Sequence, residues 1–295
     1  MIKDIKHKLS SVVLKTFPKW QANRLYRSIF NRNINWKNPT EFNEKLRWFQ
    51  FYTDTSKWSE LADKYRVRNY LQNRGYGDLL VNLYGVWDNA DNIDFTKLPD
   101  SFVIKTNHGC GSVYIINDKN TVDLEAIRQN LKKDLNDRFG VATAEPHYLR
   151  IKPVVIAEEL LRQDGDFSTS LVDYKMYCVK GEPVFCAVMY NRDIHGHRYD
   201  VNLYDNNWKE VNHLIADLHH THRGQSVIPK PRNFERMKQF CKDMCSEFEF
   251  VRMDFYECGG KLYFGEFTFT PGACSGGSLG KEASQRLSEK INLHT

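Results

Sequence analysis

The chain has 295 residues, 41% of them hydrophobic, and its 42 lysines and arginines outnumber its 37 acids to give a formal net charge of +5. This length and hydrophobic content suffice for one large domain or for two to three smaller lobes. Acids and bases are mixed along the chain, which argues against a nucleic-acid binder because such proteins concentrate basic residues in a patch or tail.

The N-terminal segment is basic and only moderately apolar. Its apolar run is short and interrupted by Lys15, so it does not read as a signal peptide, and no stretch of about 20 apolar residues predicts a membrane span. Ile2, Ile5 and Leu9 recur at helical spacing between lysines, which fits either a helix packed on its own domain or one resting on an anionic membrane surface. The seven cysteines include no C-x-x-C pair and are expected to be free thiols. We expect a cytoplasmic protein, with contact at the inner face of the membrane as an open alternative.

The pattern of hydrophobic residues changes from helical to alternating near Leu98. Before it, Thr40 is expected to cap one helix, and a second helix is expected to start at Ser59 and stop at Gly75. The expected helices cover residues 38–52, 59–75, 122–140 and 233–248, and the expected strands and hairpins cover 101–106, 111–117, 152–161, 173–190 and 251–269. This order predicts an α+β fold with a helical region over 1–97, a small lobe over 98–161 and a larger lobe over 162–295.

A lysine and a glycine-rich turn follow the first expected strand. Lys105 ends the strand SFVIKT, and the turn TNHGCGS precedes a second strand. Glycines let backbone N–H groups approach phosphate oxygens closely, and a lysine supplies charge. The segment lacks the P-loop pattern, because a strand rather than a helix follows it. An ordinary turn and a phosphate-binding turn therefore both stay open.

Acidic residues end the apolar strand near residue 158. Glu158 and Glu159 come directly before two leucines, and such an edge acid followed by exposed backbone suits the amino group of adenine. On the next strand, Asp173 and Lys175 share one face because side chains alternate. They form either a structural ion pair or part of a nucleotide site.

The last hairpin, VRMDFYECGGKLYFGEFTFTPGA, carries charged residues on one face. A three-residue loop over 259–261 would pair Asp254 with Glu266 and Arg252 with Thr268. Two facing carboxylates about 4 Å apart repel by roughly 4 kcal/mol at an effective dielectric near 20. A divalent cation between them relieves that repulsion, and Mg²⁺ suits carboxylates that leave room for phosphate oxygens. A surface hairpin with acids facing water is the alternative.

These features follow one another in an order that resembles the ATP-grasp fold. GEFTFTPGA is similar to the E-x-N-x-x-P-G strand of ligases such as D-alanine–D-alanine ligase. The segments FNEKLRWFQFY, LADKYRVRNYL, LPDSFVIKTNHGCGSVYII and GEFTFTPG resemble the TupA-like ATP-grasp family of bacterial surface-polysaccharide clusters. The resemblance runs from about Pro39 to Gly272.

The resemblance implies an ATP- and Mg²⁺-dependent carboxylate–amine ligase with two α+β lobes. The residues it assigns to ATP are Lys105, Asn107, Gly109, Gly111, Ser112, Glu158, Glu159, Leu161 and Lys175. Those it assigns to Mg²⁺ are Asp254, Glu266 and Thr268, while Arg252 would steady the transferred phosphoryl group and Gly272 would present its N–H to the acceptor. Because the family usually has asparagine where this chain has Thr268, a second metal site is open to question.

The implied reaction converts a substrate carboxylate to an acyl phosphate, which an amine attacks to give an amide. The implied substrates are small-molecule or glycan carboxylates and amines of cell-surface polysaccharide synthesis. Two other functions stay open: a glycosyltransferase that uses Asp164 and Asp166 as a D-x-D metal motif, and a non-catalytic nucleotide-binding protein. A histidine-rich segment is either a loop, an acceptor-binding insertion or a metal site, and its histidines are His213, His219, His220 and His222.

Overall fold

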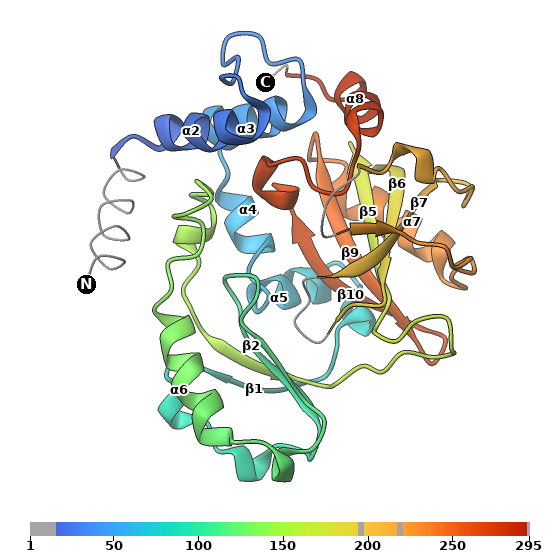
Figure 1. The fold of residues 1–295 in the computed structure, drawn as a ribbon. Coiled ribbons are helices and arrows are strands. Elements are labelled where there is room, and N and C mark those ends of the chain that lie inside the picture. Colours follow the sequence, from blue (N-terminus) through green and yellow to red (C-terminus); the bar gives the residue numbers. More distant parts are fainter. Residues whose placement is uncertain (1–15, 194–197, 217–220, 294–295) are drawn as a thin grey trace. The chain divides into compact units, whose positions relative to one another are not determined.

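The computed structural model describes residues 16–193, 198–216 and 221–293 (Figure 1). The chain forms two compact units, each built from two separate stretches: unit 1 holds residues 1–21 and 55–161, and unit 2 holds residues 22–54 and 162–295. The expected helical region 1–97 thus contributes to both units. The basic helix expected over residues 2–13, and His219 and His220, lie outside the described residues.

Unit 1 contains a four-stranded antiparallel sheet. The strands are β1 (Leu83–Trp87), β2 (Phe102–Thr106), β3 (Val113–Ile116) and β4 (Val155–Glu158), in the order β1-β4-β2-β3. Helix α6 (Leu124–Leu135) lies along this sheet (Figure 1). Its Leu131 packs in one apolar cluster with Phe102 and Ile104 of β2 and with Val155 and Ala157 of β4. The alternation of buried residues in β2 leaves Val103 and Lys105 on the other face.

The helix expected over 59–75 is wrong, because the chain forms two helices there. They are α4 (Ser56–Leu61) and α5 (Arg66–Asn73). Asp63 lies between them, and its Oδ1 accepts hydrogen bonds from the backbone N–H groups of Tyr65 (2.9 Å) and Arg66 (3.1 Å). An aspartate that satisfies these free N–H groups starts a new helix instead of continuing the old one. Gly75 follows α5 with a φ of 81°, as a stop signal should.

Unit 2 contains a six-stranded sheet in the order β10-β9-β5-β6-β7-β8, in which only the β7–β8 pair is parallel. The strands are β5 (Asp173–Val179), β6 (Glu182–Tyr190), β7 (Tyr199–Asp205), β8 (Thr221–Arg223), β9 (Val251–Cys258) and β10 (Lys261–Thr268). Helix α7 (Phe234–Cys245) packs on the sheet, and its Phe240 meets the rings of Phe255, Phe264 and Phe267. This packing fixes which face of β9 and β10 is apolar and leaves the other face to the charged residues.

The remaining α-helices of the described residues are α2 (Pro18–Phe30), α3 (Phe42–Tyr52) and α8 (Lys281–Lys290). The cap of α3 is Glu41 rather than the expected Thr40, and Glu44 completes a capping box with it. Glu44 also accepts from Arg32 at 2.6 Å, so this buried acid organises the loop before α3. Lys45 of α3 donates to two carbonyls at the end of α8, those of Ser288 (2.7 Å) and Ile291 (2.8 Å). Among the described residues, no helix is both long and apolar enough to cross a bilayer.

The last hairpin reaches the expected side-chain pairing by a different route. Its loop has two residues, because Cys258 pairs with Lys261, and the expected three-residue loop is therefore wrong. A β-bulge at Gly265 then supplies the extra residue, so Glu266 faces Asp254 and Thr268 faces Arg252. A bulge shifts register by one residue just as a longer loop does, so the predicted pairs are confirmed although the predicted cause is not.

Candidate functional site

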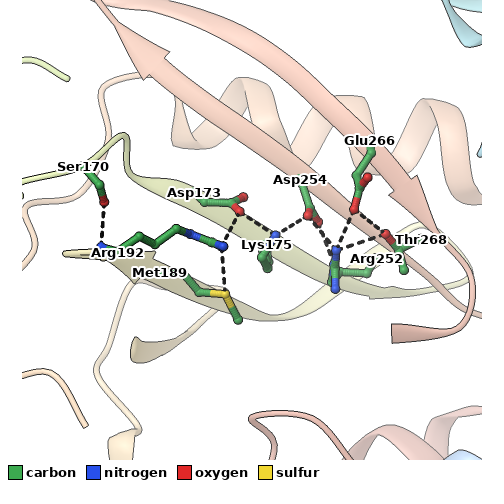
Figure 2. Close-up of polar contacts among 9 residues, drawn as sticks. All are labelled: Ser170, Asp173, Lys175, Met189, Arg192, Arg252, Asp254, Glu266 and Thr268. Carbon is green, nitrogen blue, oxygen red and sulfur yellow. Dashed lines mark hydrogen bonds and ion pairs between the residues drawn. The ribbon is translucent and has the colours of Figure 1, made fainter. Parts of the chain in front are cut away.

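A row of charged side chains crosses three neighbouring strands of unit 2. The register places Lys175 of β5 opposite Asp254 of β9, and Asp254 opposite Glu266 of β10. Paired residues of antiparallel strands point to the same face, so the charged groups of all three strands meet there. Figure 2 shows the row, which continues from Glu266 and Thr268 through Arg252 to Asp173 and Arg192.

Arg252 joins the two acids of the hairpin. Its Nε lies 2.6 Å from Asp254 Oδ1, and one terminal nitrogen lies 2.6 Å from Asp254 Oδ2, so the pair is bidentate. The same terminal nitrogen reaches Glu266 Oε1 at 3.1 Å and Thr268 Oγ1 at 3.0 Å. Thr268 in turn donates its hydroxyl to Glu266 Oε1 at 3.1 Å. The hydroxyl of Thr268 thus lies beside Glu266 and Arg252.

Lys175 joins the same acid from the other side. Its Nζ donates to Asp254 Oδ2 and lies 2.6 Å from Asp173 Oδ2, which Arg192 also contacts at 3.1 Å. These acids and bases alternate along the row, with three of each charge among Asp173, Asp254, Glu266, Lys175, Arg192 and Arg252. Alternation lets the chain bury charges that would otherwise be expensive to remove from water.

Burial shifts the pKa values of the central pair. Burial raises the pKa of Asp254, whose exposed fraction is 2%, although Arg252 and Lys175 oppose that shift. Burial by itself would lower the pKa of Arg252, but the carboxylates of Asp254 and Glu266 raise it well above its ordinary value. The arginine is therefore a fixed positive charge, whereas the buried carboxylate gains from any further cation placed beside it.

The oxygen atoms of Asp254, Glu266 and Thr268 can hold Mg²⁺ only if another molecule supplies further ligands. Asp254 and Glu266 are oxygen ligands on facing strands, and Thr268 adds a hydroxyl, which is the chemistry that Mg²⁺ takes. Within the described residues, no group of three or more histidine, cysteine or acidic side chains forms a metal site by itself. A second observation points to a ligand: Asp173 Oδ1 is buried with no hydrogen-bond partner among the described residues. Phosphate oxygens and ribose hydroxyls are groups that would complete such a site.

The turn after β10 has an unusual backbone. Gly272, Ala273 and Cys274 have consecutive φ values of 56°, 52° and 53°, in the left-handed region that only glycine enters without strain. Arg47, a fully buried residue of α3, donates to the carbonyl of Ala273 at 2.6 Å. Gly272, which is predicted to present its N–H to the acceptor substrate, therefore lies in a turn that α3 holds in place.

Two basic side chains of unit 1 pair with Glu158, and one of them is the predicted nucleotide residue Lys105. Glu158 Oε2 lies 2.5 Å from Lys105 Nζ, and Glu158 Oε1 lies 3.1 Å from a terminal nitrogen of Arg68. The β2–β4 register explains the first contact, because Glu158 faces Val103 and so lies diagonally beside Lys105. Burial lowers the pKa of Arg68, and Glu158 opposes that shift. Glu158 is thus ion-paired on both oxygens.

The glycine-rich turn has a buried base and an exposed tip. The amide of Asn107 donates to Asp63 at 2.8 Å and to the Lys152 carbonyl at 3.0 Å, and accepts from the Val154 N–H at 2.8 Å. Gly111 is exposed and has a φ of 90°. Lys64 donates to the carbonyl of Gly109 at 2.7 Å, and Ser112 stands next to β3. The side chain of Asn107 therefore anchors the turn to unit 1.

The other predicted residues occupy partly exposed positions. Glu159 donates its backbone N–H to the Asn82 carbonyl at 2.9 Å, and Leu161 ends unit 1. In the D-x-D segment, Asp164 accepts from the backbone N–H of Gly259 in the β9–β10 turn, and Asp166 is exposed. A cavity of about 910 Å³ in unit 2 lies among α3, α8 and the loop before α3, and none of the predicted site residues lines it.

Three residues of these clusters are not predicted from the sequence. Arg192 follows β6, and the pairing of Asp173 with Met189 in the β5–β6 hairpin brings it to Asp173, so only a hairpin register could have indicated it. Arg68 and Arg47 lie on helices among other charged residues, and no pattern distinguishes them. Their roles come from tertiary contacts alone.

Comparison with known proteins gives one family. A model of the TupA-like ATP-grasp family matches residues 44–292, and no curated protein matches the chain. The chain is similar to the solved D-alanine–D-alanine ligase from Bacillus anthracis, with 15% identity and a TM-score of 0.49 over 79% of this chain and 66% of that one. It is also similar to the D-alanine–D-alanine ligase from Helicobacter pylori, with 13% identity and a TM-score of 0.47 over 87% of this chain and 68% of that one. The ATP-grasp ligase PsnB with its minimal precursor is 10% identical, with a TM-score of 0.43 over 84% of this chain and 65% of that one.

The chain spans about two thirds of the length of these solved ligases. The family model, by contrast, covers most of the chain, including the unit 2 cluster and the turn after β10. This chain belongs to the TupA-like ATP-grasp family, and its α+β fold is an ATP-grasp fold.

Proposed function

We propose that this protein is an ATP- and Mg²⁺-dependent ligase that joins a carboxylate to an amine. The observation that carries the proposal is the row of charges on β5, β9 and β10, in which Asp254 and Glu266 face each other beside Arg252 and Lys175. Membership in the TupA-like ATP-grasp family supports the proposal that this row of residues binds nucleotide phosphates and their metal.

Each unit contributes residues to the proposed binding of ATP. In unit 2, Asp254 and Glu266 would hold Mg²⁺ with help from Thr268, and Lys175 would contact phosphate oxygens. The residues proposed for unit 1 are Lys105, the Asn107-anchored turn with Gly109, Gly111 and Ser112, and the nucleoside contacts Glu158, Glu159 and Leu161. For Glu158 to accept from the adenine amino group, one of its two ion pairs must loosen, and Lys105 is the partner whose charge the phosphates would attract.

The proposed reaction needs no nucleophile from the protein. A substrate carboxylate oxygen attacks the γ-phosphorus of ATP, the bond to the β-phosphate oxygen breaks, and ADP leaves. An amine nitrogen then attacks the acyl carbon, phosphate leaves, and the amine proton passes to solvent. Bound Mg²⁺ would neutralise phosphate charge, Arg252 would steady the phosphoryl group, and the backbone N–H of Gly272 would face the acceptor.

The biological setting is also a proposal. The proposed substrates are small-molecule or glycan carboxylates and amines of cell-surface polysaccharide synthesis, as the resemblance of the sequence motifs implies. We propose a cytoplasmic location, because the seven cysteines are free thiols, as expected in a reducing compartment. We also propose a peripheral contact with the inner face of the membrane.

Calorimetric titration with Mg·ATP tests the proposal. Glu266→Gln keeps the size of the side chain but removes the charge that faces Asp254, so we expect nucleotide affinity to fall by at least about tenfold with the fold intact. Glu182→Gln is the matched control, because Glu182 is an exposed acid of the same sheet. Equal affinity of both variants and the parent would contradict the metal assignment.

Turnover distinguishes the ligase from the other functions. We expect ADP release to depend on both a carboxylate and an amine, across a panel of uronic acids and amino acids. Binding of UDP- or GDP-sugars without affinity for ATP would favour a glycosyltransferase. Binding of ATP without release of ADP for any acceptor pair would favour a nucleotide-binding protein that lacks catalysis.

A further inference from the structure

The positive charge of the chain is concentrated at its N-terminus, contrary to the even mixing expected from the whole sequence. The first 31 residues hold seven of the 42 lysines and arginines but only one of the 37 acids, Asp4. The remaining residues, 32–295, hold 35 bases and 36 acids and are almost neutral. The net charge of +5 therefore comes from this segment, whose basic residues are Lys3, Lys6, Lys8, Lys15, Lys19, Arg24 and Arg27.

Helix α2 presents an aromatic and basic stripe within this segment. Phe17, directly before the helix, is 61% exposed, and Trp20 in its first turn is 58% exposed. Arg24 and Arg27 are exposed and follow Trp20 at intervals of four and three residues, which places Trp20, Arg24 and Arg27 on one face of the helix. The opposite face holds the buried Ala22 and Tyr26. The helix contains no acidic residue.

We propose that this stripe, formed by Phe17, Trp20, Arg24 and Arg27, binds the surface of a bilayer that contains anionic phospholipid. Aromatic rings partition to the boundary between headgroups and acyl chains, so the exposed rings of Phe17 and Trp20 gain by leaving water. Each arginine near an anionic surface strengthens binding by about fivefold, and α2 itself carries no acid that would repel the lipid. The inference deepens the proposed membrane contact and involves none of the residues proposed for catalysis.

The composition of the stripe favours lipid over other partners. A nucleic acid would contact the arginines, but nucleic-acid-binding surfaces are larger basic patches than the three basic residues of α2, Lys19, Arg24 and Arg27. A second copy of the chain would bury the rings, yet it would bring two stripes of the same charge together. An anionic bilayer satisfies the rings and the charges at once.

Sedimentation of the full chain with vesicles, without ATP, tests the inference. We expect binding to mixed phosphatidylglycerol–phosphatidylcholine vesicles, weak binding to phosphatidylcholine alone, and weaker binding as salt increases. Arg27→Glu should weaken binding by at least about fivefold, and Trp20→Ala should weaken it as well. Lys97→Glu is the matched control, because it makes the same change of charge at an exposed position of unit 1 and should bind like the parent.

Several results would overturn the inference. They are equal binding to both kinds of vesicle, equal loss in Arg27→Glu and Lys97→Glu, and light scattering that shows self-association lost in Trp20→Ala. Salt-sensitive binding to a single-stranded oligonucleotide without binding to vesicles would assign the stripe to nucleic acid. Circular dichroism of each variant confirms that the fold persists. The titration with Mg·ATP does not depend on this stripe. A failure to bind vesicles would therefore not count against the proposed ligase activity, which that titration tests separately.

Discussion

Arg47 shows how one buried side chain fixes the backbone beside the proposed site. It is fully buried on α3 and donates at 2.6 Å to the carbonyl of Ala273, the middle of three residues with left-handed φ values. Left-handed backbone at a residue other than glycine costs on the order of 1–2 kcal/mol, so the surrounding contacts must hold it. The second terminal nitrogen donates to Gln50 at 2.8 Å, which orients the guanidinium group.

Replacing Arg47 should therefore destabilise unit 2. We expect Arg47→Met to lower the free energy of unfolding by about 2–3 kcal/mol, because it removes the charged hydrogen bonds from a buried guanidinium to the Ala273 carbonyl and to Gln50. Arg47→Lys keeps one donor and should lose less. Urea unfolding measures the change, with Arg286→Met as the control, since Arg286 is exposed and pairs with Glu282 on its own helix. Equal stability of the two methionine variants would show that the contact does not hold the turn.

The last hairpin shows what a sequence predicts about an element and what it leaves open. Alternation predicted the strands and their charged face, and the pairs Asp254–Glu266 and Arg252–Thr268 are confirmed. The predicted three-residue loop is wrong, because the extra residue lies in the strand at Gly265. Both arrangements give the same pairs beyond the bulge, so the pattern of side chains cannot distinguish them.

Gly265 is needed because the strands approach closely at the bulge. A Cβ at this position would lie 3.0 Å from the backbone oxygen of Asp254 and 3.2 Å from a ring carbon of Tyr256. Gly265→Val should lower the free energy of unfolding by about 1–3 kcal/mol and weaken Mg·ATP binding, because the strand must shift beside Asp254. Gly259→Asn is the control: no atom lies within 4 Å of its Cβ position, and asparagine tolerates the positive φ of 59°. A stable Gly265→Val with unchanged nucleotide affinity would contradict this account of the bulge.

Elements whose limits depend on distant contacts were not predicted. The break between α4 and α5 comes from Asp63, which caps α5 and also accepts from Asn107 in the glycine-rich turn. Helical spacing continues across this break, so the sequence favoured one helix. The same reason explains Arg192, whose place beside Asp173 depends on the folded β5–β6 hairpin. Local patterns predicted the elements, and tertiary contacts set their ends.

At the scale of the whole molecule, the chain does not fold as three consecutive pieces. Residues 22–54 belong to unit 2 although residues 55–161 follow them in unit 1. The contacts of Lys45 with the end of α8, and of Arg47 with the turn after β10, join the N-terminal helix α3 to the C-terminal part of the chain. A fragment that begins at residue 98 would thus lack part of the packing of unit 2. Helical spacing predicts α3 correctly, but it does not indicate that α3 contacts α8 and the turn after β10.

Nucleotide and metal should act on the stability of the whole chain. A ligand that binds only the folded state stabilises it by about 2.7 kcal/mol at 100 times its Kd. For a protein of this size, we expect Mg·ATP to raise the midpoint of thermal unfolding by several degrees. Removing Mg²⁺ with EDTA should reverse most of that rise, because Asp254 and Glu266 then repel the triphosphate instead of sharing a cation with it.

Differential scanning calorimetry separates this effect from general binding of anions. We expect Glu266→Gln to lose the dependence on Mg²⁺ but to keep the unfolding midpoint of the parent in the absence of nucleotide, because the side chain is only half-buried. Inorganic triphosphate with Mg²⁺ should stabilise less than ATP, since it makes none of the contacts proposed for the nucleoside at Glu158 and Leu161. An equal rise with ATP in Mg²⁺ and in EDTA would mean that the facing acids of the hairpin hold no metal.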